Sequence, residues 1–264
     1  MRYRERVVVV TGAAGGIGRA LCMQLGREGA HLGLIDIDAV ALERLQNDLT
    51  AAGFCCAAAH ADVGSREQAR AAVRSLEAKL GTADILIAAA GICRLSPIDD
   101  LRTDQLDEMM RVNFFGTAFV VEAVLPQMIE RRNGHIVGVA SLAASCPLPF
   151  ESAYCASKAA VATYLQSLRA PLRRRGIKVT VAYLGFVKTA LLDNLLAETG
   201  APPPPGTVGA EKVAVKLSDG IRRGARVIRF PASTAWLARI AGWLPAALYD
   251  WVMIRIAARL RLPH

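Results

Sequence analysis

The sequence of 264 residues lacks several features that mark particular protein classes. Its six cysteines have no metal-ligand spacing, since Cys55 and Cys56 are adjacent and the others are scattered, so neither a metal site nor a disulfide framework is expected. The first six residues contain three arginines and lead directly into an apolar strand pattern, unlike a signal peptide. Charged residues, prolines or polar residues interrupt the apolar runs before they reach the roughly 20 residues of a spanning helix. These absences favour a cytoplasmic protein with reduced thiols.

Apolar and basic residues are abundant instead. Hydrophobic residues make up 53% of the chain, and 32 Lys/Arg against 23 Asp/Glu give a net charge of +9. A chain of this length can form a single large α/β core. No internal repeat is found beyond an alternation of strand and helix patterns.

A glycine-rich turn follows the first predicted strand. The β-branched run Val7–Val10 is typical of a buried parallel strand, and Thr11-Gly12-Ala13-Ala14-Gly15-Gly16-Ile17-Gly18 follows it, with a helical pattern after that. Strand, turn and helix in this order suit a dinucleotide, because glycines allow close backbone approach and a helix N-terminus attracts the pyrophosphate. A glycine-rich turn without a ligand is the alternative.

A second motif lies in Ser152-Ala153-Tyr154-Cys155-Ala156-Ser157-Lys158. On a helix, the spacing of four residues puts Tyr154 and Lys158 on one face. An ammonium group beside a tyrosine lowers the pKa of the hydroxyl, so that the pair can exchange a proton with an alcohol oxygen. Ser141 upstream adds a hydroxyl that can orient this oxygen. Without a cofactor site, the same spacing would be typical of an ordinary helix face.

Together these motifs resemble the classical short-chain dehydrogenases/reductases. The T-G-x-x-x-G-x-G turn of the family is present as Thr11, Gly12, Gly16 and Gly18, and its serine, tyrosine and lysine match Ser141, Tyr154 and Lys158. The fourth catalytic residue of the family, an asparagine, matches Asn113. The resemblance covers roughly residues 5–230. It implies an α/β fold with a Rossmann-like doubly wound parallel sheet.

The resemblance also implies which residues hold a nicotinamide cofactor. Asp36 ends the second strand, where a carboxylate can bind the adenosine ribose and repel a 2′-phosphate, so NAD is favoured over NADP. In the family, the residue matching Asp62 binds the adenine amino group. Asp36 could instead cap a helix, and Asp62 could simply start a turn. The complete predicted set is Gly12, Gly16, Ile17, Gly18, Asp36, Asp62, Val63, Gly91, Tyr154, Lys158, Val187 and Thr189.

The sequence departs from the family pattern in two places within this region. Ala88 and Ala89 stand where the family has asparagine, which leaves backbone groups to be satisfied in another way. Leu184 replaces a proline before Gly185. We interpret both as structural variations. Further strands are predicted at 31–35, 54–60, 84–88, 135–140, 177–183 and 226–230, with helices at 39–52 and within 101–132.

The C-terminal segment departs most. Residues 231–264 extend beyond the usual end of the family and hold all three tryptophans. From residue 206 to the end there are ten Lys/Arg and three Asp/Glu, so +7 of the net +9 falls there. Apolar residues mixed with arginine predict helices that lie at a membrane interface, cover the substrate pocket or contact another subunit. Nucleic-acid binding is not expected, because the arginines are dispersed.

We therefore predict a catalytic domain at 1–230 and a helical extension at 231–264. The predicted activity is NAD-dependent interconversion of a secondary alcohol and a ketone, on a lipophilic substrate such as a steroid, a retinoid or a 3-hydroxyacyl chain. Tyr154 would exchange the proton, Lys158 would tune it, Ser141 would position the reacting oxygen, and Asn113 would support a proton relay. A homodimer or homotetramer, with possible peripheral membrane contact, is expected. An NADPH-dependent 3-oxoacyl-type reductase and a lipid-surface protein with a vestigial site are the alternatives.

Overall fold

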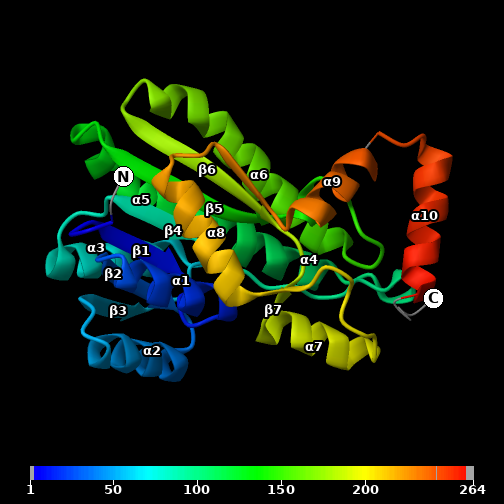
Figure 1. The fold of residues 1–264 in the computed structure, drawn as a ribbon, viewed down its shortest axis with the longest axis horizontal. Helices are drawn as coiled ribbons and strands as arrows, with labels where there is room; N and C mark the ends of the chain where they lie inside the picture. Colours follow the sequence, from blue (N-terminus) through cyan, green and yellow to red (C-terminus); the bar gives the residue numbers. More distant parts are fainter. Residues whose placement is uncertain (1–2, 242, 260–264) are drawn as a thin grey trace.

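The computed structural model describes residues 3–241 and 243–259. A parallel sheet of seven strands forms the middle layer, in the order β3-β2-β1-β4-β5-β6-β9, with helices on both faces (Figure 1). The predicted Rossmann-like doubly wound fold is therefore confirmed. The strands are β1 Val7–Thr11, β2 His31–Asp36, β3 Cys56–His60, β4 Ile85–Ala88, β5 Gly134–Ser141, β6 Ile177–Leu184 and β9 Val227–Phe230.

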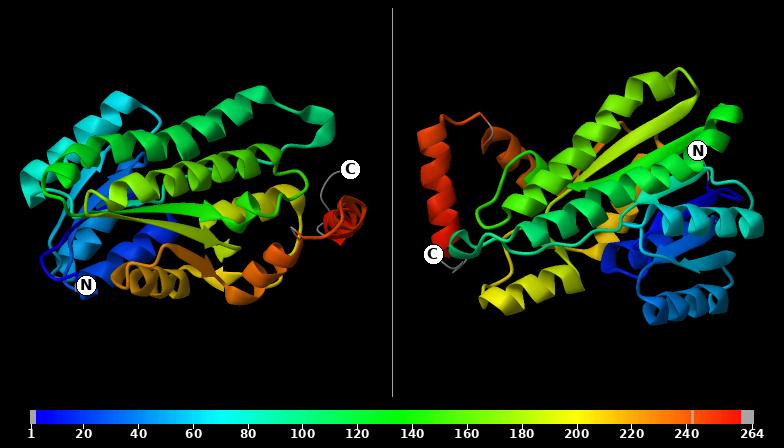
Figure 2. Two further views of the ribbon diagram at one scale, coloured as in Figure 1. Left: turned by 90° about the horizontal axis from the view of Figure 1, so that it is seen from above. Right: turned by 180° about the vertical axis from the view of Figure 1, so that it is seen from behind.

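Burial explains why the central strands are continuously apolar. Every residue of β1 and β4 is buried, because helices cover both faces of the sheet at these positions. The first face is covered by α1 Gly16–Arg27, α2 Ala39–Ala51 and α8 Ala210–Arg222. The opposite face is covered by α3 Arg66–Leu80, α5 Gly116–Glu130 and α6 Ser152–Arg173 (Figure 2).

The two helical patterns expected between residues 101 and 132 form one continuous helix. It consists of α4 Thr103–Met109, a π-helical turn η2 Met110–Phe115, and α5. By length and composition, residues 103–130 could cross a membrane. In this fold, however, α5 packs on α3 and on the sheet, and Val120, Val121 and Val124 belong to the core. Packing in the core therefore explains the buried apolar residues of this helix.

Two further segments lie beyond the carboxyl ends of the strands. The short strands β7 Val187–Lys188 and β8 Val208–Gly209 pair at the base of a loop that carries α7 Ala190–Thr199 and the proline run. Short 3-10 turns occur at η1 Ile98–Asp100 and η3 Leu142–Ala144.

The predicted C-terminal extension contains two helices, α9 Ala232–Ala241 and α10 Ala246–Arg259. Figures 1 and 2 show α10 at the end of the molecule, past the carboxyl ends of β5 and β6. Ala235 of α9 and Met253 of α10 are buried. Gly242 and residues 260–264 of the predicted extension lie outside the described residues.

Candidate functional site

The glycine turn packs so closely against its neighbours that it leaves no room for side chains at three of its glycines. Gly12 has a φ of 64°, and a Cβ atom on it would lie 2.8 Å from Ala90 Cα. A Cβ on Gly16 would lie 2.5 Å from Thr189 Cγ2, and one on Gly18 would clash with the Gly12 carbonyl. The turn after β1 and the loop after β6 therefore meet here, which brings the predicted residues Gly16 and Thr189 together. Such a bare backbone cradle at the start of α1 fits a pyrophosphate.

Thr11 accounts for the missing asparagine of the family pattern. Its Oγ1 accepts hydrogen bonds from the backbone N–H groups of Ala89 at 3.1 Å and Ala90 at 3.2 Å. The ends of β1 and β4 are thus linked through a side chain of β1. Thr11 thus satisfies backbone N–H groups at the end of β4, where alanine side chains offer no hydrogen bonds of their own.

Asp36 faces the glycine turn. Its carboxylate accepts hydrogen bonds from the N–H groups of Ala14 at 2.8 Å and Asp38 at 3.1 Å. The residue that caps α2 is Asp38, whose side chain accepts from the Ala41 N–H at 3.0 Å. The helix-cap alternative for Asp36 is therefore wrong, and the ribose contact of Asp36 stays a prediction.

Asp62 and Val63 follow β3. Asp62 starts a turn, because its carboxylate accepts from the Gly64 N–H at 2.8 Å, and it also forms an ion pair with Arg111 at 2.6 Å. Val63 is buried against Gly116 of α5, where an added Cβ would lie 2.8 Å from Val63 Cγ2. The partner Arg111 was not predicted from the sequence.

Tyr154 and Lys158 lie one turn apart on α6, as predicted. Lys158 Nζ is 5.7 Å from the centroid of the Tyr154 ring and donates a hydrogen bond to the Val139 carbonyl at 3.2 Å. The lysine is only 5% exposed, and burial lowers its pKa to about 8. Burial has this effect because it disfavours the charged form of an amine.

The predicted lowering of the Tyr154 pKa is wrong for this structure. Burial raises the pKa of the Tyr154 hydroxyl, and the nearby Cys93 and Glu151 add to this, whereas a hydrogen bond with Ser141 opposes it. The physical reason is position, since the ammonium group lies by the ring and is bonded to a carbonyl of β5. Ser141, at the end of β5, therefore contacts the hydroxyl more directly than Lys158 does.

Ser141 is fixed by the backbone on both sides. Its Oγ accepts from the Ala143 N–H at 3.1 Å, which caps the η3 turn, and donates to the Leu184 carbonyl at 3.4 Å. Leu184 thus contacts the serine although the proline of the family pattern is absent.

Asn113 is completely buried in the π-helical turn. Its Oδ1 accepts from the Ile92 N–H at 2.8 Å, and its Nδ2 donates to the Ile92 carbonyl at 3.0 Å and to Ser157 Oγ at 2.9 Å. Ser157 in turn donates to the Tyr154 carbonyl at 2.8 Å. The asparagine therefore links the loop after β4 to the helix that carries Tyr154 and Lys158.

Gly91 lies where these groups meet. A Cβ on Gly91 would be 2.9 Å from Lys158 Nζ and 3.1 Å from Asn113 Oδ1. Glycine at this position lets Lys158 and Asn113 pack closely against the backbone. Gly91, Asn113 and Lys158, which are far apart in the sequence, are thus brought together as predicted.

Three residues near this cluster were not assigned a role from the sequence. Ser157 belongs to the Tyr154 motif and lies one turn from that tyrosine, which is a usable sequence signal. Glu151 lies one turn before Tyr154, and burial raises the pKa of its carboxyl to about 7. Buried Cys93 interacts electrostatically with Lys158 and Tyr154, but nothing in its sequence context indicates this.

The comparison with known families settles the family. The model of the short chain dehydrogenases matches residues 6–200. The chain belongs to the short-chain dehydrogenase/reductase family. Members of this family are oxidoreductases that use NAD(P) and act on small molecules.

Relatives and solved structures agree with this assignment. An uncharacterized oxidoreductase of Myxococcus xanthus is 35% identical over 93% of this chain and 95% of that protein. The dehydrogenase/reductase SDR family member 7B of Mus musculus is 37% identical, over 75% of this chain and 62% of that protein. A family member from Burkholderia phymatum in complex with NAD has a TM-score of 0.83 at 26% identity, covering 90% of this chain and 93% of that one. The crystal structure of levodione reductase has a TM-score of 0.81 at 25% identity, covering 89% of this chain and 99% of that one.

Proposed function

We propose that this oxidoreductase interconverts a secondary alcohol and a ketone with NAD(H). The observation that carries the proposal is the convergence of Ser141, Tyr154 and Lys158 with Gly91 at the carboxyl ends of β4 and β5. Ligands of open parallel sheets bind at this edge. The glycine cradle at Gly12, Gly16 and Gly18 opens at the same edge and fits the cofactor.

The side chains divide the proton chemistry among them. When bound, the nicotinamide supplies the hydride acceptor or donor. Tyr154 would accept the alcohol proton as a phenolate during oxidation and donate it from its hydroxyl during reduction, and Ser141 would hold the reacting oxygen beside it. Lys158 would bind the nicotinamide ribose, and Asn113 is linked through Ser157 to the backbone of Tyr154 in the same helix. Val187 and Thr189 would contact the carboxamide.

Asp36 supports NAD over NADP. Its carboxylate is held toward the glycine turn by Ala14 and Asp38, where it would accept from the ribose hydroxyls and repel a 2′-phosphate. The solved structure from Burkholderia phymatum contains NAD, which is consistent with this choice. The alternative is a reductase that uses NADPH. It would need a basic side chain to bind the 2′-phosphate, and this chain has Ala14, Gly15 and Ile37 at the expected positions.

Apolar residues around the reacting groups support a lipophilic substrate. Leu142 follows Ser141 directly, and Leu148 and Phe150 lie in the segment that leads to Tyr154. The test is a panel of hydrophobic alcohols and ketones, including steroids, retinoids and 3-hydroxyacyl compounds, with NAD(H) and NADP(H) measured side by side by nicotinamide absorbance. Turnover of secondary alcohols with NAD is expected. If no compound is turned over although NAD binds, the site is vestigial.

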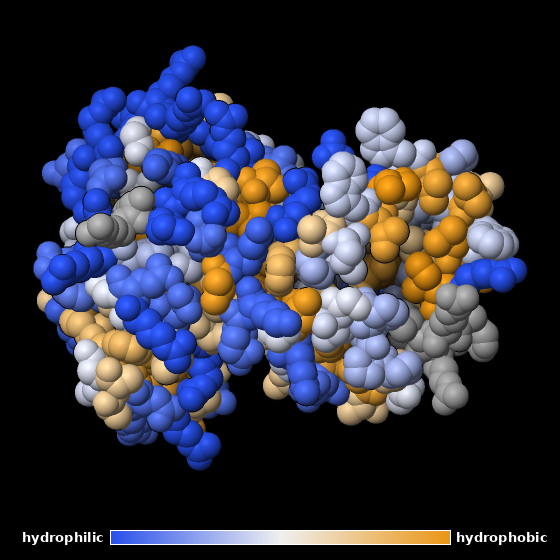
Figure 3. Space-filling model, viewed as in Figure 1, coloured by the Kyte–Doolittle hydropathy of each residue, from blue (hydrophilic) through white to orange (hydrophobic). Residues whose placement is uncertain are grey.

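The C-terminal helices support a second proposal, contact with an anionic membrane. Large apolar side chains of α9 and α10 are exposed: Trp236, Leu237, Ile240, Leu248, Trp251 and Ile254. Figure 3 shows apolar residues gathered over this end of the molecule. Arg239 and Arg255 lie among them, and arginine beside exposed apolar residues suits the headgroup region of anionic lipid.

Sedimentation with anionic vesicles at low and high salt tests this contact. The variant Trp236→Ser/Ile240→Ser is expected to bind less than the wild type, whereas Val40→Ser, which removes an exposed apolar residue of α2, is the matched control. Absence of binding at either salt concentration would exclude the membrane. An apolar surface of this kind would then be assigned to a subunit contact, which equilibrium sedimentation without lipid would reveal.

A further inference from the structure

A hollow of about 210 Å³ lies between the η3 turn and the C-terminal helix α9. Its wall includes Leu142, Ser145, Arg229, Ala238, Arg239 and Trp243. Leu142 directly follows Ser141, so the hollow adjoins the segment that carries the reacting serine. The cofactor residues predicted from the sequence do not line it.

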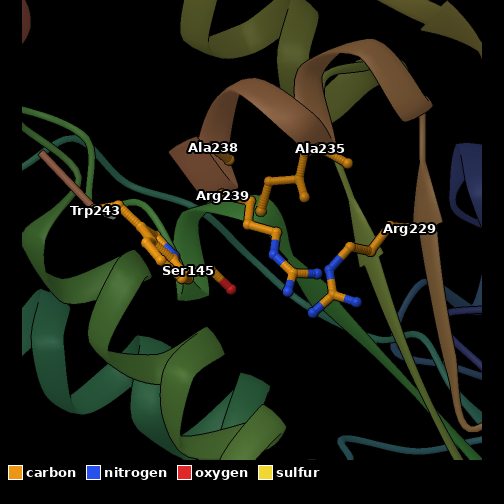
Figure 4. Close-up of a pocket in the computed structure, with 7 residues that line it drawn as sticks. Ser145, Arg229, Ala235, Ala238, Arg239 and Trp243 are labelled. Carbon is orange, nitrogen blue, oxygen red and sulfur yellow. The ribbon is translucent and has the colours of Figure 1, made fainter. Parts of the chain in front are cut away.

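Two guanidinium groups share this hollow. Figure 4 shows Arg229, which comes from β9, and Arg239, which comes from α9, and both line this hollow. Arg229 is held in place because its guanidinium carbon lies 4.9 Å from the centroid of the Tyr183 ring. Among residues 3–241 and 243–259, no Asp or Glu forms an ion pair with either arginine.

This arrangement has an electrostatic consequence. Two like charges in one hollow repel, and the repulsion is relieved when an anion binds there. A phosphate monoester carries about −1.5 to −2 charges at pH 7, which matches two guanidinium groups, whereas a carboxylate matches only one. Guanidinium groups bind phosphate oxygens through paired hydrogen bonds.

The remaining walls suit the organic part of such a ligand. The Ser145 hydroxyl points toward the arginines in Figure 4 and can donate a further hydrogen bond. Leu142, Ala238 and the indole of Trp243 provide apolar contacts on the other sides. We propose that the hollow formed by Arg229, Arg239 and Ser145 binds a phosphate monoester, either a soluble compound or the headgroup of a phosphatidic acid.

Equilibrium dialysis with labelled glycerol phosphate tests this site at constant ionic strength. Saturating NAD is present, so that the glycine turn does not bind the probe. The wild type is expected to bind one equivalent, and acetate is expected to compete at least about tenfold less well than inorganic phosphate. Arg229→Gln and Arg239→Gln should each raise the Kd about tenfold or more, in line with the loss of a hydrogen bond to a charged group. Arg226→Gln, which removes an exposed arginine just before β9, is the matched control.

Ser145→Asp provides a second variant that does not depend on removing an arginine. It places a carboxylate beside the guanidinium groups and should abolish binding, whereas Ser145→Ala should weaken it only slightly. An unchanged Kd in Arg229→Gln, Arg239→Gln and Ser145→Asp, or no saturable binding by the wild type, would overturn the proposal. Because the assay needs no turnover, its result is independent of the proposed reaction.

Vesicles distinguish the two sources of the phosphate. If phosphatidic acid is the ligand, vesicles that contain it should bind the wild type more strongly than phosphatidylglycerol vesicles of equal charge, and Ser145→Asp should remove the difference. If the ligand is a soluble ester, the two lipids should behave alike while dialysis still shows the site. Both results support a phosphate site, and they assign it to different ligands.

Discussion

The hydroxyl of Tyr249 in α10 donates a hydrogen bond to the carbonyl of Pro147, at 2.5 Å. Pro147 lies in the segment that joins Ser141 to Tyr154, so the C-terminal extension is tied to the loop between two of the residues assigned to catalysis. Cys146 Sγ lies 3.8 Å from the same hydroxyl. We infer that α10 helps to hold this loop in place.

Tyr249→Phe tests this role. Loss of the hydrogen bond is expected to cost about 1 kcal/mol of stability, and a looser loop should raise KM more than it lowers kcat. Tyr164→Phe is the control, because no hydrogen bond of the Tyr164 hydroxyl is found among the described residues, and its ring packs against Phe114 in the same way without the hydroxyl. Equal KM values in both variants would show that α10 does not hold the loop between Ser141 and Tyr154 in place.

Asn113 is expected to be needed for both stability and activity. Asn113→Ala leaves the N–H and carbonyl of Ile92 and the hydroxyl of Ser157 without their partner in a buried place. The expected loss is about 2 kcal/mol or more in the free energy of unfolding, measured by urea denaturation. Asn133→Ala, at an exposed position, should change it by less than about 0.5 kcal/mol. A stable but inactive Asn113→Ala variant would show that Asn113 acts in the proton relay and contributes little to stability.

Asp36 should set cofactor choice through its charge. Asp36→Asn keeps an acceptor for the Ala14 N–H but removes the charge, whereas Asp36→Ala removes both. Both variants should lose discrimination against NADP, and Asp36→Ala should also bind NAD more weakly. The measurement is the ratio of the NAD and NADP dissociation constants. Wild-type protein that prefers NADP would show that the role given to Asp36 is wrong.

Glu151 should make stability depend on pH. Burial raises the pKa of its carboxyl from 4.5 to about 7, so the folded chain holds a proton that the unfolded chain has released. The folded state therefore binds more protons between pH 4.5 and 7, and the free energy of unfolding falls as pH rises through this window, by at most about 3 kcal/mol.

Glu151→Gln should remove this fall, and the exposed Glu43→Gln should retain it. Burial also lowers the pKa of His135 from 6.5 to about 4, which makes stability rise between these values. Since both variants keep His135, the difference between their stability curves reports Glu151 alone. Parallel curves would mean that Glu151 is ionised in the folded protein at pH 5.

The sequence was sufficient for the sheet and for the residues around its carboxyl edge. Buried β-branched runs such as Val7–Val10 are local patterns, and the glycine turn and the Tyr154 motif are fixed by short-range spacing. Contacts between distant segments could not be predicted. The role of Thr11 as a substitute for the missing asparagine depends on the approach of β1 to β4, and the π-helical turn at Asn113 has no local sequence signature.

The directions of the pKa shifts also could not be predicted from the sequence. The spacing of Tyr154 and Lys158 correctly places both on one face, but it does not tell where the ammonium group points. The pKa of Tyr154 is raised chiefly by burial, and Cys93 and Glu151, which the fold brings close to it, add to this. The hollow between Arg229 and Arg239 likewise exists only because α9 returns to the end of the sheet.

Tyr154→Phe tests the central claim, that this site transfers a proton to or from an alcohol oxygen. With the best secondary alcohol from the substrate panel and saturating NAD, kcat is expected to fall by about 10² or more, a size typical of losing a general acid or base. The Kd for NAD should stay within about twofold, and Tyr164→Phe should keep full activity. Near-wild-type turnover by Tyr154→Phe, with NAD bound, would contradict the account.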